Sequence, residues 1–229
     1  LSAATKTVTD AVTIYANENE SVSSMLNKAQ PTVLLSAASG MSSSSSADAI
    51  QGILNQFNLS EDQAMHVADT VEKLSSEIAL DFSKGCDTIS QSIATSGSVV
   101  NEAGMSFEKY AALVSTTAEK TRVSGSQIGN AFKTIFSRIS RSKDGLTTDA
   151  EMSDAEAALK SVGVSVRGAD GDLRDISDTL DNLNEVWGTL NHSQRSYVAE
   201  MAAGVRQKNI FEAAMDSYNK ALQLEQDAL

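Results

Sequence analysis

Proline, cysteine, histidine and aromatic residues are all scarce in this chain. Its 229 residues include one proline, one cysteine and two histidines, and aromatic residues make up 5%. The β-branched and aromatic clusters that build sheets are therefore few, whereas Ala, Ser and Leu are abundant. Because 41% of the residues are hydrophobic, the chain is able to bury a genuine core. This composition predicts an all-α fold, a multi-helix bundle of antiparallel helical hairpins.

Other absences exclude whole classes of protein. The single Cys86 has no partner for an internal disulfide, so nothing points to an oxidising compartment, and we expect it to be a small core residue. No run approaches the roughly 20 apolar residues that span a bilayer, and the amino terminus has no signal-peptide pattern. The segment is therefore expected to be cytosolic. Because it begins at Leu1, we expect an excerpt from a longer chain.

Basic residues are outnumbered and scattered. Thirty acidic residues stand against 18 basic ones, which gives a net charge of −12. No stripe of Lys and Arg is present that neutralises successive phosphates. We therefore expect no binding of nucleic acid through this segment.

Apolar residues recur three and four positions apart in several segments, a spacing that places them on one helical face. The first segment covers residues 64–78 and follows Ser60 and Gln63, whose side chains predict a capped helix start. Two more cover residues 107–118 and 128–139, and only a short connection separates them. We expect these two helices to form an antiparallel hairpin that buries their aromatic faces together.

The carboxyl-terminal part continues this pattern, with one interruption. Residues 176–190 form another apolar face, the run 191–194 predicts the cap of a further helix, and a last helix covers 210–222. Between helices, residues 164–167 alternate apolar and polar side chains, and Asp170-Gly171 is a strong turn signal. The chain is thus predicted to contain one small β-hairpin near residues 164–174, which leans on neighbouring helices.

The first 60 residues are less regular. Weak helical signals cover residues 8–15 and 22–28, and Pro31 predicts a break before an apolar run. The serine tract 42–46 is either a flexible link or a helix start. We place a boundary there, between an amino-terminal helical segment, 1–45, and a helical domain, 46–229, with a second loop at 142–148.

No catalytic, cofactor-binding or metal-binding residue is predicted. His66 and His192 lie far apart in the sequence, and no Cys, His or Glu completes a metal-binding spacing around His66. Four aspartates are close together but lack the calcium-loop pattern, so turn formation by the first and helix capping by the third explain them better. These aspartates are Asp170, Asp172, Asp175 and Asp178. No serine lies in Gly-x-Ser-x-Gly.

Two glycines and three arginines each allow two interpretations. Gly129 and Gly204 mark either close helix approach or local looseness of the backbone. Arg138, Arg174 and Arg206 either pair with carboxylates inside the fold or lie in solvent.

Three blocks of sequence, in this order, resemble the core region of bacteriophage tail tape measure proteins over roughly residues 30–215. The first is the helix pair 105–113 and 123–139, whose second helix starts with a glycine and ends in an apolar and arginine pattern. The second, 158–183, has the order helix, Gly, Asp-Gly turn, Leu-Arg and new helix. The third, 190–209, has a polar cap, an amphipathic helix and a Gly-x-Arg step. The amino-terminal third matches only loosely.

The resemblance implies a structural and assembly component of a phage or prophage tail, which helps to set tail length and to initiate assembly. It implies a homo-oligomer in the lumen or tip of the virion tail, and in the host cytoplasm during assembly. The implied partners are tail tube, tail-tip or baseplate proteins and tail assembly chaperones, with no cofactor. Because glycines and short turns punctuate this segment, we expect it to be an anchoring or initiation module and not the ruler itself.

Two alternatives belong to other classes. A free-standing helical adaptor or signalling protein fits the Ala and Ser richness and the acidic charge, and predicts a reading frame that ends near Leu229. A peptidoglycan hydrolase requires an acid pair or a metal set, and none stands out. We therefore expect no enzymatic activity.

Overall fold

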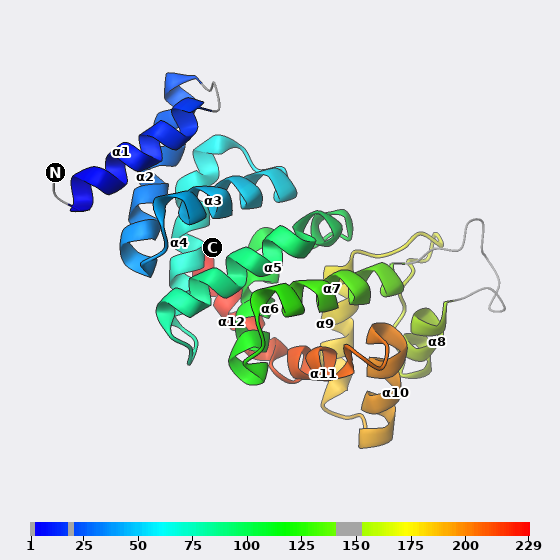
Figure 1. The fold of residues 1–229 in the computed structure, drawn as a ribbon. Coiled ribbons are helices and arrows are strands. Elements are labelled where there is room, and N and C mark those ends of the chain that lie inside the picture. The colour runs from blue at the N-terminus through cyan, green and yellow to red at the C-terminus, as the bar shows by residue number, and fades with distance from the viewer. Residues whose placement is uncertain (1–2, 18–20, 141–152) are drawn as a thin grey trace.

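The computed structural model of the chain describes residues 3–17, 21–140 and 153–229 (Figure 1). Within these residues every regular element is helical and no strand occurs, so the all-α prediction is confirmed. The helices are α1 (Ala3–Asn17), α2 (Val22–Ser39), α3 (Ser43–Phe57), α4 (Ala64–Ser76), α5 (Phe82–Glu102), α6 (Phe107–Thr121), α7 (Gly125–Ile139), α8 (Asp154–Ser161), α9 (Ile176–Trp187), α10 (His192–Ala203), α11 (Lys208–Asp216) and α12 (Tyr218–Ala228). A short 3-10 turn, η1 (Glu61–Gln63), precedes α4. The loop expected at 142–148 lies outside the described residues.

Short polar side chains start the helices where the sequence predicts. The Gln127 side chain accepts a hydrogen bond from the backbone N–H of Ser124 at 3.2 Å, and Asn191 Oδ1 accepts one from Gln194 N–H at 3.0 Å. Such caps satisfy amide groups that have no partner within the helix. Ser42 Oγ accepts from Ser45 N–H at 3.0 Å, so the serine tract is a helix start and not a flexible link.

The β-hairpin prediction is wrong. The chain doubles back near residue 170, but Arg167 and Leu173 form only one isolated antiparallel bridge. The Ser165 side chain instead binds the backbone of Arg167: its Oγ donates to the Arg167 carbonyl at 2.7 Å and accepts from the Arg167 N–H at 3.3 Å. Local side-chain bonds of this kind compete with a strand ladder. The result is a turn, in which Val164 and Val166 are buried against the helices.

Two helix boundaries also differ from the prediction. Pro31 lies inside α2 and does not break it, although proline has no N–H for the preceding turn. Eight residues of α2 are buried, since α2 packs on α1, α3 and α4, and this burial outweighs the missing bond. The last predicted helix is divided at Ser217, whose Oγ donates to the carbonyl of Ala213 at 2.7 Å. A hydroxyl bonded back in this way bends a helix.

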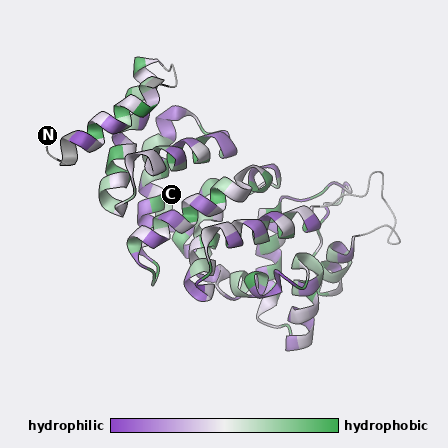
Figure 2. Ribbon diagram, viewed as in Figure 1, coloured by the Kyte–Doolittle hydropathy of each residue, from purple (hydrophilic) through white to green (hydrophobic). Residues whose placement is uncertain are grey.

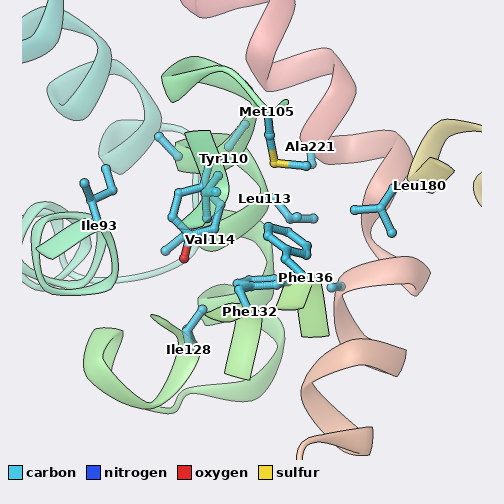
Figure 3. Close-up of a cluster of buried hydrophobic side chains, with 14 of the residues drawn as sticks. Ile93, Met105, Tyr110, Leu113, Val114, Ile128, Phe132, Phe136, Leu180 and Ala221 are labelled. Atoms are coloured by element: carbon cyan, nitrogen blue, oxygen red, sulfur yellow. The ribbon is translucent and has the colours of Figure 1, made fainter. Parts of the chain in front are cut away.

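The core is centred on α5, α6 and α7 (Figure 3). Tyr110 and Phe132 meet edge to face with ring centroids 5.6 Å apart, so the predicted hairpin does bury its aromatic faces together. The Tyr110 hydroxyl lies 2.9 Å from Ser92 Oγ and 2.6 Å from Ser96 Oγ. Burial raises the pKa of Tyr110 to about 12, which keeps the phenol neutral. Cys86 is fully buried, as expected.

Helix α7 packs most extensively on α5, and glycines allow the two backbones to touch. A Cβ at Gly125 would lie 2.2 Å from the carbonyl oxygen of Thr88, and one at Gly129 would lie 2.7 Å from that of Ser92. Real Cβ atoms do not approach backbone oxygens this closely. Of the two interpretations of Gly129, close helix approach is therefore the correct one.

The ends of the molecule are made by different helices (Figure 1). The pair α1 and α2 lies at one end, where Ala11, Tyr15, Ala29 and Ala47 form a small separate cluster. Helices α8 and α10 lie at the other end. Helix α2 contacts α3 and α4, which follow the predicted boundary near residue 45. These contacts do not decide whether a domain ends there, and the boundary stays a prediction.

Gly129→Ala is expected to lower the free energy of unfolding by about 1–3 kcal/mol, because the methyl group forces α7 away from α5. The matched control is Gly52→Ala, within α3, where an added Cβ meets nothing within 4 Å. That substitution is expected to raise stability by roughly 0.5–1 kcal/mol, since alanine favours the helix. Urea unfolding measures both. Equal effects of the two substitutions would contradict the close approach.

Candidate interaction surface

The two histidines lie on different helices. His66 Nε2, on α4, is 2.8 Å from Glu108 Oε1 on α6, and His192 is exposed at the first residue of α10. In the part of the chain that the structure describes, no group of three or more His, Cys, Asp or Glu residues could hold a metal ion. The His66–Glu108 pair therefore links two helices.

The aspartates near residue 170 have local roles. Asp170 Oδ1 accepts from Asp172 N–H at 3.2 Å, which is the expected turn contact. Asp175 occupies the N-cap position of α9, but its side chain makes no cap hydrogen bond, so that part of the prediction is wrong. The carboxylate lies instead against Gly104, where a Cβ would be 2.1 Å from Asp175 Oδ1.

Two of the three arginines singled out from the sequence bind backbone carbonyls. Arg138 donates from Nε and Nη2 to the carbonyl of Met201 at 3.2 and 3.0 Å, near the carboxyl end of α10, where a cation is favoured. Arg174 Nε donates to the carbonyl of Arg167 at 3.1 Å, and Arg206 is exposed. Gly204 ends α10 with φ +74°, a conformation that suits glycine, so backbone conformation and not close packing explains it.

Two buried lysines escaped the sequence analysis. Lys109 on α6 donates to both oxygens of Asp181 on α9, at 2.9 and 2.7 Å, and Tyr218 on α12 donates to Asp181 Oδ1 at 3.0 Å. Lys28 on α2 is fully buried and donates to Gln51 Oε1 at 2.6 Å, with its ammonium 4.8 Å from the Tyr15 ring centre. Each lysine ties several helices together.

Asp216, at the end of α11, is a third polar junction. It accepts hydrogen bonds from Trp187 Nε1 at 2.9 Å and from Lys120 Nζ at 3.0 Å. Burial alone would raise the pKa of Asp216, but these two hydrogen bonds and the charges of Lys120 and Arg195 outweigh it, so the pKa lies below its ordinary value of 3.8. The junction fastens α11 to α6 and α9.

A shallow groove of about 220 Å³ runs between α3 and α5. Met41, Ile53 and Ile93 contribute apolar side chains, and Asp48 and Asp87 contribute acidic ones. Gln91 already donates to Asp87 at 2.7 Å. Its two hydroxyl groups belong to Ser45 and Ser90, and Ser90 Oγ donates to the carbonyl of Cys86 at 2.8 Å.

An apolar surface lies at the α1–α2 end. Of the seven exposed large hydrophobic residues among those described, four lie there, Val8 on α1 and Val22, Leu26 and Leu34 on α2. We call the exposed side of α2 the α2 face. It consists of the apolar residues Val22, Leu26, Leu34, Ala37 and Ala38 and the uncharged polar residues Ser23, Asn27 and Gln30. Figure 2 shows the hydropathy of this end beside that of the rest of the molecule. An exposed apolar patch of this kind marks a contact site.

Comparison with known families decides the identity of the chain. The family described as "Phage-related minor tail protein" matches residues 1–204, from the start of the chain through α10. The chain belongs to this family. The match includes the amino-terminal helices, which resembled tape measure proteins only loosely in their motifs.

Two relatives of this chain carry a more specific name. The chain is 26% identical over 152 residues to the "Probable tape measure protein" of Escherichia phage P2, and this aligned region covers 66% of the chain and 17% of the relative. The chain is 25% identical over 169 residues to the "Tape measure protein" of Pneumococcus phage Dp-1, and here the aligned region covers 73% of the chain and 14% of the relative. The matched region thus spans less than a fifth of either relative. No solved structure matches the chain significantly.

None of the helices in the described part of the chain is both long and apolar enough to cross a membrane. The α2 face was missed from the sequence because only the packing of α2 against α1, α3 and α4 shows which of its sides stays uncovered.

Asp216→Asn is expected to destabilise the protein at pH 7. The Asp216 side chain is 38% exposed, so solvent screening limits the loss to about 1 kcal/mol. Because the folded pKa is lowered, the carboxylate contributes stability above pH 3.8, and this is lost as the pH falls through the folded pKa. Urea unfolding at pH 7 and at an acidic pH below the folded pKa should show a wild-type advantage at the first pH that disappears at the second.

The control for this experiment is Asp227→Asn, an exposed position in the last turn of α12. Its effect is expected to stay within about 0.5 kcal/mol at both pH values. An advantage of wild type over Asp216→Asn that is the same at both pH values would contradict the role given to the Asp216 charge.

Proposed function

We propose that this chain is the folded core region of a phage tail tape measure protein, a structural and assembly component that helps to set tail length and to initiate tail assembly. One observation carries the proposal: the minor tail protein family matches residues 1–204, and the two relatives described above are both named as tape measure proteins. The chain covers only a small part of those relatives, so the part of this function that it performs is inferred from its own fold.

That fold favours anchoring over measuring. An extended helical ruler converts chain length into tube length at about 1.5 Å per residue. Among the described helices the longest, α5, has 21 residues and so spans about 30 Å, and the chain turns back repeatedly onto a shared core. A molecule folded in this way holds a fixed position and does not stretch along a tube. We therefore assign it the initiation or anchoring part of tail assembly.

We further propose where and with what it acts. The chain functions as a homo-oligomer in the lumen or at the tip of the virion tail, and it is present in the host cytoplasm during assembly. Its partners are tail tube proteins, tail-tip or baseplate proteins and tail assembly chaperones. The apolar α2 face and the acidic remainder of the surface supply two different kinds of contact for such partners.

A structural role needs no catalytic residues, and we propose none. The family and the two relatives are named for tail structure. The side chains of Lys109, Asp181 and Asp216 make hydrogen bonds between helices and so hold these helices together. No particular contact or site in the structure favours the adaptor alternative.

An in-frame deletion of this segment in the encoding phage tests the assembly role. Lysates are expected to contain filled heads without tails in electron micrographs, because initiation fails. Supplying the chain from a plasmid should restore tails. Normal tails in the deletion phage would overturn the proposal.

Insertions test the division between anchor and ruler. Helical heptads inserted elsewhere in the encoding gene, outside residues 1–229, should lengthen tails by about 1.5 Å per added residue. The matched control places the same residues as a loop in the α9–α10 connection, at 188–191, and should leave tail length unchanged. Equal lengthening by both insertions would show that this segment is itself part of the ruler.

A further inference from the structure

The α2 face is apolar and strongly exposed although it belongs to a well-packed helix. Val22, Leu26 and Leu34 are exposed by 70%, 61% and 45%, while Thr32 and Leu35 on the opposite side are fully buried. Val22, Leu26, Gln30 and Leu34 follow one another at intervals of four residues, so they form a continuous stripe along the helix. Val8 on α1, exposed by 48%, adds to the same end of the molecule.

This face also carries no charge, in a chain with net charge −12. The stretch from Ser21 to Ala47 contains no Asp or Glu, and its only cation, Lys28, is fully buried on the other side of α2. All 30 acidic residues of the chain lie outside this stretch, together with 17 of its 18 basic ones. Two copies that meet through acidic surfaces repel each other, whereas two α2 faces meet without like charges.

We propose that the α2 face binds the α2 face of a second copy of this chain, in an isologous contact with twofold symmetry. In such a contact the same patch serves both partners, so it must be self-complementary, and an uncharged apolar stripe satisfies this condition. The contact deepens the proposed tail function and depends on that function for the setting in which copies meet. The surface itself follows from the chain alone.

The size of the face predicts a weak contact. The 18 residues of α2 give a stripe about 27 Å long. A helix about 10–12 Å wide gives about 600 Å² of buried surface over the two copies, and α1 adds to this, so the contact falls in the range of weak, transient interfaces below about 1,200 Å². Association should therefore depend on concentration, and it becomes effective where copies are held close together.

A membrane fits the α2 face less well. Helices that lie on anionic lipid carry Lys and Arg beside the apolar stripe. In α1 and α2 the one exposed cation among the described side chains is Lys6. The acidic chain as a whole is repelled by anionic headgroups. Membrane binding is therefore an outcome against which the proposal is tested.

Sedimentation equilibrium of the 229-residue chain is the first test. Wild type should change from monomer to dimer between about 1 µM and about 1 mM, the span in which a small interface associates. Leu26→Asp places two like charges in the contact and should weaken association by roughly tenfold or more. The matched control is Val205→Asp, at a residue 76% exposed in the loop after α10, which should dimerise as wild type does.

Circular dichroism must show that all three proteins are equally folded, which the exposure of Leu26 and Val205 leads us to expect. A wild type that stays monomeric over the whole range overturns the proposal. So does a dimer that Leu26→Asp does not weaken, because another surface then makes the contact.

Disulfide trapping locates the symmetry axis. Cys86 is the only cysteine and is fully buried, so a cysteine introduced on the surface has no competitor. Gln30→Cys, in the middle of the α2 face, should form a disulfide with its own counterpart when copper phenanthroline is the oxidant, provided that the two Cα atoms approach within about 7 Å. Val205→Cys should not. Equal trapping at both positions indicates random collision and overturns the proposal.

One further outcome names another occupant. Co-flotation of wild type, but not Leu26→Asp, with phosphatidylglycerol vesicles would assign the α2 face to a membrane and overturn the proposal. The phage deletion described above separates this inference from the proposed function. If the chain dimerises through α2 while the deletion phage makes normal tails, the function fails and the contact stands. If the purified chain is monomeric while the deletion abolishes tails, the contact fails and the function stands.

Discussion

The contact between the backbones of α5 and α7 positions the helices around it. Gly125 and Gly129 leave no room for side chains between the two helices, so α7 rests directly on the small residues of α5. The larger side chains of α7, among them Phe132 and Phe136, are then directed toward α6, where Tyr110 lies between them and the serines of α5 (Figure 3). A wider crossing would open gaps that these rings do not fill, and interiors of proteins tolerate few such gaps.

Around this crossing the later helices are held by polar contacts as much as by apolar ones. Asp181 joins α9 to the buried Lys109 and to Tyr218, and Asp216 joins α11 to Trp187 and Lys120. Lys220 on α12 donates to Glu119 on α6 at 2.6 Å. Directional bonds such as these select one arrangement of helices among several that apolar stripes alone permit. A fold made of short amphipathic helices depends on this kind of selection.

Local signals explain most of what the sequence predicts correctly. The caps at Ser124 and Asn191 involve residues three positions apart, and the apolar stripes of α4, α6, α7 and α9 are read within one helix. The failures have tertiary causes. Pro31 is tolerated because neighbouring helices bury α2, and the hairpin near residue 170 is replaced by side-chain bonds to the Arg167 backbone.

The remaining features were not accessible because their partners are distant in sequence. Lys28 and Gln51 are 23 positions apart, and Lys109 and Asp181 are 72 positions apart. Nothing in the local pattern distinguishes these lysines from solvated ones. The exposed α2 face was hidden for the same reason, since only the packing of α1, α3 and α4 shows which side of α2 stays uncovered. The prediction that no residue forms a catalytic or metal site remains a prediction.

The long separation between Lys109 and its partners has a consequence for biosynthesis. The ribosome makes α6 well before it makes Asp181, which follows 72 residues later, and Tyr218 follows later still. At a translation rate of about 5–20 residues per second, Asp181 is synthesised roughly 4–15 seconds after Lys109, and during this time the apolar side of α6 is not covered by the later helices. The nascent chain therefore passes through a stage in which its centre is complete in sequence but not yet covered. The final helices complete the fold only when translation of the segment ends.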